Sequence, residues 1–299
     1  MSEAITRVGF VGLGRMGVPM VANLVRGGFA VSAVDISPDA LARAEFVGAR
    51  TSADLGDLAG EIDLLVLMLP DSDAVEKVLA DAAVAGVFGD GLLVADMSSS
   101  QPGRTRTLAG DLAGRGVRMI DAPVSGGVGG AEKATLTIMV GGDAPDVERA
   151  RPALEALGRV VPVGGVGAGH AMKALNNLLS ATHLWITGEA MAAGVQFGLD
   201  PAVMLDVFNS SSGRSGSTEK KWPEFVMTRS YGSGFGLRLM LKDMRIAVEL
   251  SEQAGVFHSL GADAVELWSR AAEDLPSTAD HTEIARWIDK REGTGSSSL

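Results

Sequence analysis

Cysteine is absent from the 299-residue sequence, and tyrosine occurs only once. Without cysteine the chain can form neither a disulfide framework nor a thiolate metal site, and it has no cysteine nucleophile. The absence also favours a reducing compartment, so we expect a cytoplasmic protein. The histidines are scattered, which disfavours a clustered metal site; they are His170, His183, His258 and His281.

Basic residues are outnumbered: 26 lysines and arginines stand against 37 acidic residues, giving a formal net charge of −11. Such a surface disfavours nucleic acid or an anionic membrane as the main partner, although a local cationic pocket can still bind a small anion. The N-terminal segment MSEAITRVGFVGLG lacks the features of a secretion signal. The apolar segment after Lys173 is interrupted by polar residues, so we expect no membrane span.

Short apolar runs alternate with amphipathic segments over the first half of the chain. The runs are RVGFVGLG, AVSAVD, DLLVLMLP, GLLVADMS, VRMIDAPV, TLTIMVGG and RVVPVGG. Continuous apolar runs separated by helical segments predict a parallel sheet covered on both faces. We therefore expect a doubly wound α/β (Rossmann) domain that binds a dinucleotide over residues 1–164.

Only helical patterns follow Gly167. Helices are predicted at 169–195, 201–209, 217–229, 239–254, 258–273 and 280–290. We expect an all-helical domain for substrate binding and dimerisation over 165–291, beginning with a long interdomain helix. The segment 292–299 is expected to be a disordered tail.

The segment GFVGLGRMG places three glycines between the first strand and a helix. Glycine permits the tight turn, the approach to a pyrophosphate and close helix packing, and the helix N-terminus attracts phosphate. Asp35 ends the second predicted strand, where a carboxylate can accept hydrogen bonds from a ribose 2′-hydroxyl and would repel a 2′-phosphate. The pattern predicts NAD in preference to NADP, bound by Gly12, Leu13, Gly14, Arg15, Met16, Gly17 and Asp35.

Other strand ends also carry candidate binding residues, because ligands of such sheets bind beyond the carboxyl ends of the strands. Leu69 and Pro70 are expected along the adenosine side of the cofactor. Ser98 and Ser99 can hydrogen-bond the nicotinamide ribose, although capping of the following helix is an equally ordinary role for either serine. In DAPVSGG, a serine and two glycines (125–127) expose consecutive N–H groups suited to a carboxylate.

Lys173 and Asn177 begin the long helix. At i and i+4 they project from one face, in the expected crevice between the domains. Desolvation and a nearby oxidised nicotinamide would favour the neutral amine, which can accept the hydroxyl proton during hydride transfer. The alternative is a lysine whose head group extends to water.

Together these segments resemble the β-hydroxyacid dehydrogenase family, and within it the 3-hydroxyisobutyrate dehydrogenases. The similar stretches are GFVGLGRMGVPM, DMSSSQP, DAPVSGGVGGAEKATLTIMVGG, GAGHAMKALNN and GFGLRLMLKDMRIA. The resemblance implies NAD(P)-dependent oxidation of a 3-hydroxy carboxylate or the reverse reaction. It also implies homodimers or homotetramers built on the helical half. By the same resemblance, Lys173 is the catalytic lysine, Asn177 orients the substrate, and Lys242 reaches the cofactor. The substrate carboxylate is expected at Ser125, Gly126 and Gly127, and Asn176 is a further expected substrate contact.

One segment, NSSSGRSGSTEKKWPEF (209–225), departs from the hydroxyisobutyrate enzymes. Arg214 could there bind a second anionic or hydroxylated substrate group, or be a solvated loop residue. The substrate therefore stays open among hydroxyisobutyrate, serine, tartronate semialdehyde, threonate and sulfonated propanediols.

Other classes of NAD(P)-binding protein match the residues of this sequence less well. Short-chain dehydrogenases need a lysine four residues after a tyrosine, whereas Tyr231 is followed at that spacing by Phe235. Imine reductases generally lack the lysine found here at 173, and 6-phosphogluconate enzymes are longer and need more cations. A non-catalytic NAD-binding module would have no need for Lys173, Asn177 and the Ser125 segment together.

Overall fold

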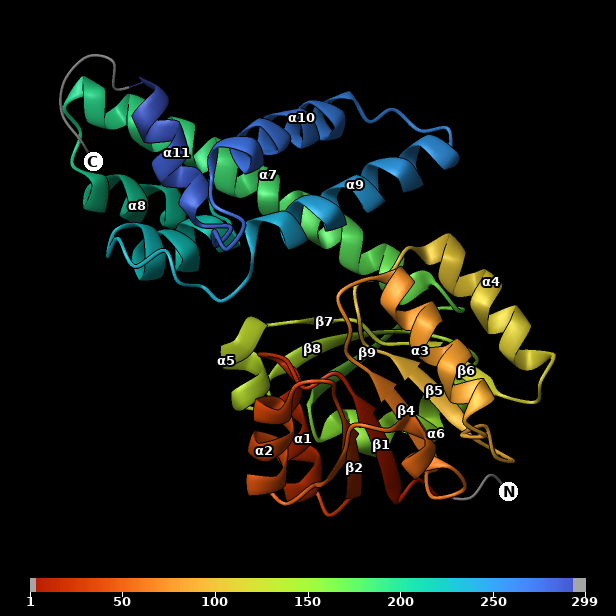
Figure 1. The fold of residues 1–299 in the computed structure, drawn as a ribbon. Coiled ribbons are helices and arrows are strands. Elements are labelled where there is room, and N and C mark those ends of the chain that lie inside the picture. Colours follow the sequence, from red (N-terminus) through yellow and green to blue (C-terminus); the bar gives the residue numbers. More distant parts are fainter. Residues whose placement is uncertain (1–3, 293–299) are drawn as a thin grey trace. The chain divides into compact units, whose positions relative to one another are not determined.

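The computed structural model describes residues 4–292 (Figure 1). The chain divides into two compact units, Met1–Lys173 and Ala174–Leu299, and the division falls inside the long helix α7 (Ala168–Phe197). The domain boundary after residue 164 stays a prediction. Of the segment predicted as a tail, Glu292 is the last residue of α11 and the remainder lies outside the described residues.

The first unit is built on one mixed sheet in the strand order β3-β2-β1-β4-β5-β6-β8-β7, with β9 paired to β8. Neighbouring strands are parallel throughout the part of this order that runs β3-β2-β1-β4-β5-β6, as expected for a Rossmann domain. β8 pairs antiparallel with β6 and β7 and parallel with β9, so the sheet is not wholly parallel. The strands are β1 (Arg7–Val11), β2 (Ala30–Val34), β3 (Arg50–Ser52), β4 (Leu64–Leu67), β5 (Leu93–Asp96), β6 (Arg118–Asp121), β7 (Val124–Ser125), β8 (Leu136–Gly141) and β9 (Gly158–Gly164).

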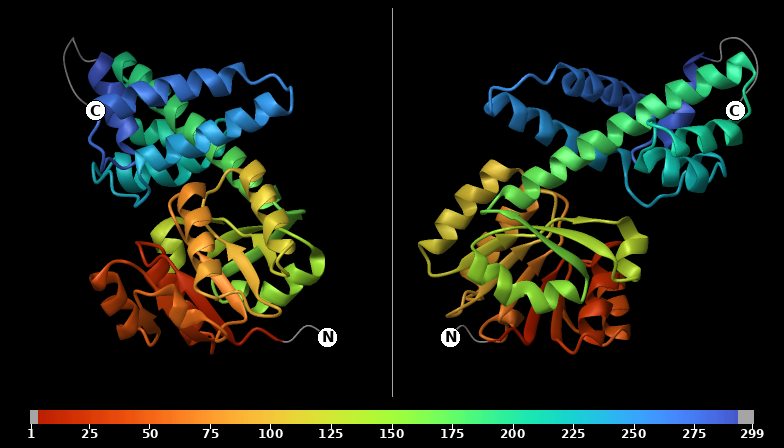
Figure 2. Two further views of the ribbon diagram at one scale, coloured as in Figure 1. Left: turned by 45° about the vertical axis from the view of Figure 1, so that its right-hand side comes forward. Right: turned by 180° about the vertical axis from the view of Figure 1, so that it is seen from behind.

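Both faces of this sheet are covered by helices, as Figures 1 and 2 show. Along β4, Leu64 and Val66 belong to one apolar cluster, while Leu65 and Leu67 belong to another on the opposite face. The first cluster includes side chains of α1 (Gly17–Arg26), α2 (Pro38–Phe46), α5 (Gly127–Glu132) and α6 (Ala144–Glu155). The second includes side chains of α3 (Ser72–Val84), α4 (Pro102–Ala113) and the 3₁₀ turn η1 (Leu55–Leu58). The predicted doubly wound architecture is confirmed.

The second unit is all helical, as predicted from the end of the strand pattern. Beyond α7 it contains α8 (Pro201–Ser210), η2 (Ser217–Val226), α9 (Leu237–Gln253), α10 (Ser259–Asp274) and α11 (Glu283–Glu292). Its core includes Trp222 and Trp268, which are almost fully buried. Asp200 caps α8 by accepting hydrogen bonds from the N–H groups of Ala202 at 2.8 Å and Val203 at 3.1 Å.

η2 is a π-helix, which differs from the ordinary helix expected at 217–229. It contains Pro223 in its interior, and proline removes a backbone N–H from the hydrogen-bond ladder. π-Helical turns are frequent at functional sites. The widened turn lies in the segment that departs from the hydroxyisobutyrate enzymes.

Between residues 4 and 292, no helix has the combination of length and hydrophobicity that a membrane crossing requires. Within the same range, no cluster of three acidic or histidine side chains is arranged to hold a metal ion.

Candidate active site

The glycine-rich turn after β1 uses its three glycines for different physical reasons. Gly12 has φ +100°, and a Cβ there would lie 2.3 Å from the carbonyl oxygen of Met68. A Cβ on Gly17 would lie 2.0 Å from the carbonyl oxygen of Gly12, so this glycine lets α1 pack against the turn. A Cβ on Gly14 would meet nothing within 4 Å. The open side of Gly14 is therefore available to a ligand, as binding of a pyrophosphate there requires.

Asp35 joins the end of β2 to this turn. Its Oδ2 accepts a hydrogen bond from the Leu13 N–H at 2.6 Å, and its Oδ1 accepts one from the Ser37 N–H at 2.8 Å. The carboxylate is half-buried, and each oxygen retains a lone pair for a further donor such as a ribose hydroxyl. Arg15 is exposed and Met16 half-buried at the start of α1. The turn and the acid thus fit a dinucleotide.

Ile36 was not among the residues expected from the sequence to bind the cofactor. It follows Asp35 directly and is 95% exposed. An apolar side chain exposed to solvent beside the predicted ribose-binding acid offers a contact for a base. The available sequence signal was an apolar residue directly after the acid that ends the second strand.

Ser98 and Ser99 occupy different environments at the carboxyl end of β5. Ser98 is 1% exposed, and its hydroxyl accepts a hydrogen bond from the Leu69 N–H at 2.9 Å. Its role in the structure is thus to tie the loop after β5 to the loop after β4. Ser99 is half-buried and Pro70 exposed. Of the two serines, Ser99 has the more accessible side chain for a ribose.

A buried polar cluster anchors the beginning of α7. Asp121, which is fully buried, accepts hydrogen bonds from the N–H groups of Gly167 at 2.7 Å and His170 at 2.8 Å. Burial raises the pKa of Asp121, and the opposing influences are the His170 side chain and these N–H groups. The ring of His170 lies 2.9 Å from the Thr105 hydroxyl through Nδ1 and 3.7 Å from Asp96 through Nε2. Sequence reasoning identified DAPVSGG but missed the anchoring role of its aspartate.

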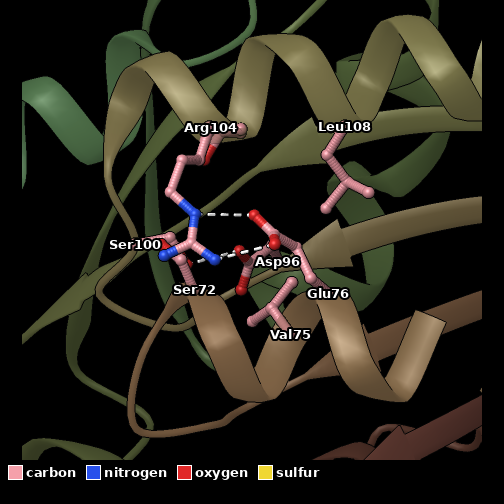
Figure 3. Close-up of a pocket in the computed structure, with 8 residues that line it drawn as sticks. Ser72, Val75, Glu76, Asp96, Ser100, Arg104 and Leu108 are labelled. Atoms are coloured by element: carbon pink, nitrogen blue, oxygen red, sulfur yellow. Dashed lines mark hydrogen bonds and ion pairs between the residues drawn. The ribbon is translucent and has the colours of Figure 1, made fainter. Parts of the chain in front are cut away.

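At the same end of the sheet an ion pair joins α3 and α4 (Figure 3). The Arg104 guanidinium donates two hydrogen bonds of 2.7 Å to Glu76 and pairs with Asp73 at 2.6 Å. These hydrogen bonds raise the pKa of Arg104 above its usual range. Beneath the pair, the Ser100 hydroxyl donates to Asp96 at 2.8 Å, as the close-up shows. The helices that follow β4 and β5 are therefore linked by this ion pair, beside the loops that carry Leu69 and the serines.

Lys173 is 8% exposed, and its Nζ donates a hydrogen bond of 2.7 Å to the carbonyl oxygen of Val124. Val124 directly precedes the Ser125-Gly126-Gly127 segment, so the structure brings the amine next to the predicted carboxylate site. Gly126 has φ +136° and Gly127 φ +62°, which are conformations that favour glycine. The amine is not extended into bulk solvent.

In the second unit, Asn177 is 4% exposed and its amide donates to Asp243 Oδ2 at 2.6 Å. The ammonium of Lys242 lies 3.3 Å from the other oxygen of Asp243. The side-chain amide of Asn176 donates to Asn177 Oδ1 at 3.1 Å. The structure thus gathers three residues that the sequence had singled out, Asn176, Asn177 and Lys242, around Asp243.

Arg214 is exposed on its loop. Its Nε donates to Glu219 at 2.7 Å, and its side chain is 64% exposed. The proposed contact with a second substrate group has no support in this geometry and stays a prediction. Lys221, which the sequence reasoning did not select, instead reaches α7: its Nζ lies 2.6 Å from the Ser180 hydroxyl oxygen.

Both halves of the chain match models of known protein families. Residues 7–165 match the family model for the NAD-binding domain of 6-phosphogluconate dehydrogenase, and residues 167–288 match that for the NAD-binding region of NADP-dependent 3-hydroxyisobutyrate dehydrogenase. The 3-hydroxyisobutyrate dehydrogenase of Pseudomonas aeruginosa is 37% identical over 278 residues, which cover 90% of this chain and 93% of the relative. The 2-(hydroxymethyl)glutarate dehydrogenase of Eubacterium barkeri is 36% identical over 268 residues, 89% of each chain.

A solved structure agrees with these relatives. The 3-hydroxyisobutyrate dehydrogenase of Mycobacterium tuberculosis with L-serine superposes with a TM-score of 0.87 at 30% identity, covering 95% of this chain and 99% of that one. Given the dinucleotide-type turn, the buried lysine and these matches across both halves, the chain belongs to the 3-hydroxyisobutyrate dehydrogenase-like β-hydroxyacid dehydrogenases, oxidoreductases that bind NAD and act on CH–OH groups.

Proposed function

We propose that the protein transfers a hydride reversibly between NAD and a small 3-hydroxy carboxylic acid, with Lys173 as the general acid and base. The observation that carries the proposal is the position of the Lys173 amine, 2.7 Å from the carbonyl oxygen of Val124 and next to Ser125, Gly126 and Gly127. A group that binds the substrate carboxylate and a group that moves the hydroxyl proton are thus supplied by adjacent parts of the first unit.

The residues of this chain divide the work. The Ser125 hydroxyl and the N–H groups of the two following glycines bind the substrate carboxylate. Lys173 accepts the proton of the substrate hydroxyl while the carbon that bears this hydroxyl loses its hydride to the cofactor. In the reverse reaction, reduction of the aldehyde, Lys173 returns the proton. Asn177, held by Asp243, orients the substrate. The nicotinamide, when bound, supplies the hydride acceptor or donor.

Oxidation of a panel of 3-hydroxy acids with NAD tests the proposal. We expect at least one acid from the group 3-hydroxyisobutyrate, L-serine and 2-(hydroxymethyl)glutarate to raise the absorbance of reduced nicotinamide. Those compounds are named in the relatives' activities or in the bound state of the similar structure. Binding of NAD without turnover of any 3-hydroxy acid would contradict the proposal.

We also propose that Asp35 makes NAD the preferred cofactor. Its carboxylate lies at the end of β2 beside the glycine turn, where a 2′-phosphate would meet a like charge. Replacing Asp35 by Asn keeps a hydrogen-bond acceptor for the Leu13 N–H and removes the charge. We expect the ratio of kcat/KM for NAD to that for NADP to fall by about tenfold, which corresponds to about 1.4 kcal/mol.

Asp39→Asn is the matched control, because Asp39 is an exposed acid on α2. That variant should leave the cofactor ratio near its wild-type value. If the Asp35 and Asp39 variants behave alike, or if wild-type protein prefers NADP, the assignment to Asp35 is wrong.

Homo-oligomerisation through the helical unit is a third part of the proposal. Along α7, Leu175, Leu179 and Ile186 are 39%, 61% and 55% exposed and share one face at i, i+4 and i+11. A solvent-facing helix normally presents polar side chains on such a face, so this stripe favours contact with a second copy of the chain.

Replacing Leu179 by Arg should dissociate the assembly. In a symmetric (isologous) interface both subunits contribute the same surface, so the substitution buries one uncompensated charge from each subunit. Sedimentation velocity would show the wild-type chain as a dimer or tetramer and the variant shifted toward the monomer. Val84→Arg, at a 92% exposed valine of α3, is the control and should sediment as wild type. A wild-type monomer would refute the proposal.

A further inference from the structure

The face of α7 that carries Asn177 continues to Ser180, one turn further along the helix. Residues three apart lie on the same side of a helix, about 4.5 Å along its axis. The Ser180 hydroxyl oxygen lies 2.6 Å from Nζ of Lys221. An ammonium from η2 is therefore placed one turn beyond the asparagine that we assign to substrate orientation.

The position of Lys221 is defined by buried neighbours. Trp222, the next residue, is 1% exposed in the core of the second unit, and the side chain of Lys221 itself is part-buried. His281 is 4% exposed, with Nδ1 placed 3.1 Å from the carbonyl oxygen of Phe235. Burial lowers the pKa of His281, a hydrogen bond with Asp280 opposes this, and the charge of Lys221 lowers it further.

We propose that Lys221 is a specificity-determining residue that binds a second carboxylate of the substrate, so that the preferred substrate class is a 3-hydroxy dicarboxylic acid. The inference rests on the proposed function, since it takes Asn177 as a substrate contact. An ammonium has three donors, so a carboxylate can bind it while the Ser180 contact is kept. Arg214, the residue that the sequence suggested for a second substrate group, has an exposed side chain that pairs with Glu219.

Two compounds can be compared to measure the effect of the second carboxylate. 3-Hydroxyisobutyrate and 2-(hydroxymethyl)glutarate share a carbon that bears a carboxylate and a hydroxymethyl group. The second compound carries a CH₂CH₂COO⁻ chain where the first carries a methyl group. The ratio of their kcat/KM values therefore reports how strongly the protein recognises the additional anion.

The decisive variant is Lys221→Met, which keeps the length of the aliphatic stem and removes the charge. We expect it to lower the ratio of kcat/KM for the dicarboxylate to that for the monocarboxylate by about ten- to a hundredfold, as loss of a charge-assisted hydrogen bond implies. Lys220→Met, at the exposed neighbouring lysine of η2, is the matched control and should leave the ratio unchanged. An equal fall for both acids in the Lys221 variant would show a structural role and overturn the proposal.

Calorimetric titration with glutarate, which has no hydroxyl to oxidise, separates this inference from the proposed function. Wild-type full-length protein with NAD should bind glutarate at least tenfold more tightly than the Lys221→Met variant does. Equal affinities would overturn the inference whatever the turnover. If neither hydroxy acid is oxidised but glutarate binding depends on Lys221, the proposed function fails while the anion site is supported.

Discussion

Replacing Lys173 by alanine is expected to reduce the turnover of a 3-hydroxy acid by about 10²–10⁴-fold, the range that general acid–base catalysis contributes. The affinity for NAD should change little, because the proposed cofactor contacts come from the glycine turn, from the ends of β2, β4 and β5 and from Lys242, all of which the substitution leaves in place. Lys173 is 8% exposed and its amine is hydrogen-bonded to Val124. A side chain from the protein surface therefore cannot replace the missing amine. Single-turnover kinetics with NAD, together with calorimetric titration of NAD, give both quantities.

Lys133→Ala is the matched control, since Lys133 is an exposed lysine at the end of α5. Its turnover should equal that of wild type. Methylamine added to the Lys173→Ala protein should restore part of the lost rate, because a small amine can occupy the space of the missing one and exchange the proton. Turnover within a few-fold of wild type for Lys173→Ala would refute the assignment of this residue as the acid and base.

Two glycine substitutions in the same turn should affect different properties: one should lower the thermal stability and the other the affinity for NAD. Gly12→Ala forces a side chain onto φ +100° and against the carbonyl oxygen of Met68. Backbone strain and steric overlap of this kind together cost about 2–6 kcal/mol, a large part of the stability of a typical domain. We therefore expect a pronounced fall in Tm or a failure to fold.

Gly14→Ala meets open space instead, so its Tm should stay within a few degrees of wild type. Its affinity for NAD should fall by about tenfold or more, because the added methyl group occupies the side from which a pyrophosphate approaches. Differential scanning fluorimetry and NAD titration distinguish the two effects. Wild-type affinity for NAD in the Gly14 variant would mean that the cofactor does not approach this side of the turn.

Hydrophobic periodicity predicts the fold well where a strand is buried on both faces. β4 reads as a continuous apolar run because Leu64 and Leu65 enter different cores. β3, with the sequence RTS, has no such run and was not expected. The predicted run VRMIDAPV is divided between β6 and β7, and β8 runs antiparallel to both. An apolar run specifies a strand but carries no information on its direction.

The site could be predicted to the extent that local sequence determines it. The glycine turn, Lys173 and Asn177 were identifiable from motif and helical spacing. The contacts between Lys221 and Ser180 and between Asp121 and His170 join residues 41 and 49 positions apart, so they depend on tertiary packing. The pairing of Arg214 with Glu219 is local, but Glu219 belongs to the π-helical segment η2, a conformation that the sequence did not predict.

A single uninterrupted helix carries both Lys173 and Asn177, and this limits how the sequence can change. Each residue of an α-helix advances the side-chain direction by about 100°. Insertion or deletion of one residue between the two would turn the asparagine away from the amine, however well the altered helix packed. Length variation among natural variants should accumulate in the connecting loops, and this four-residue interval should be kept constant.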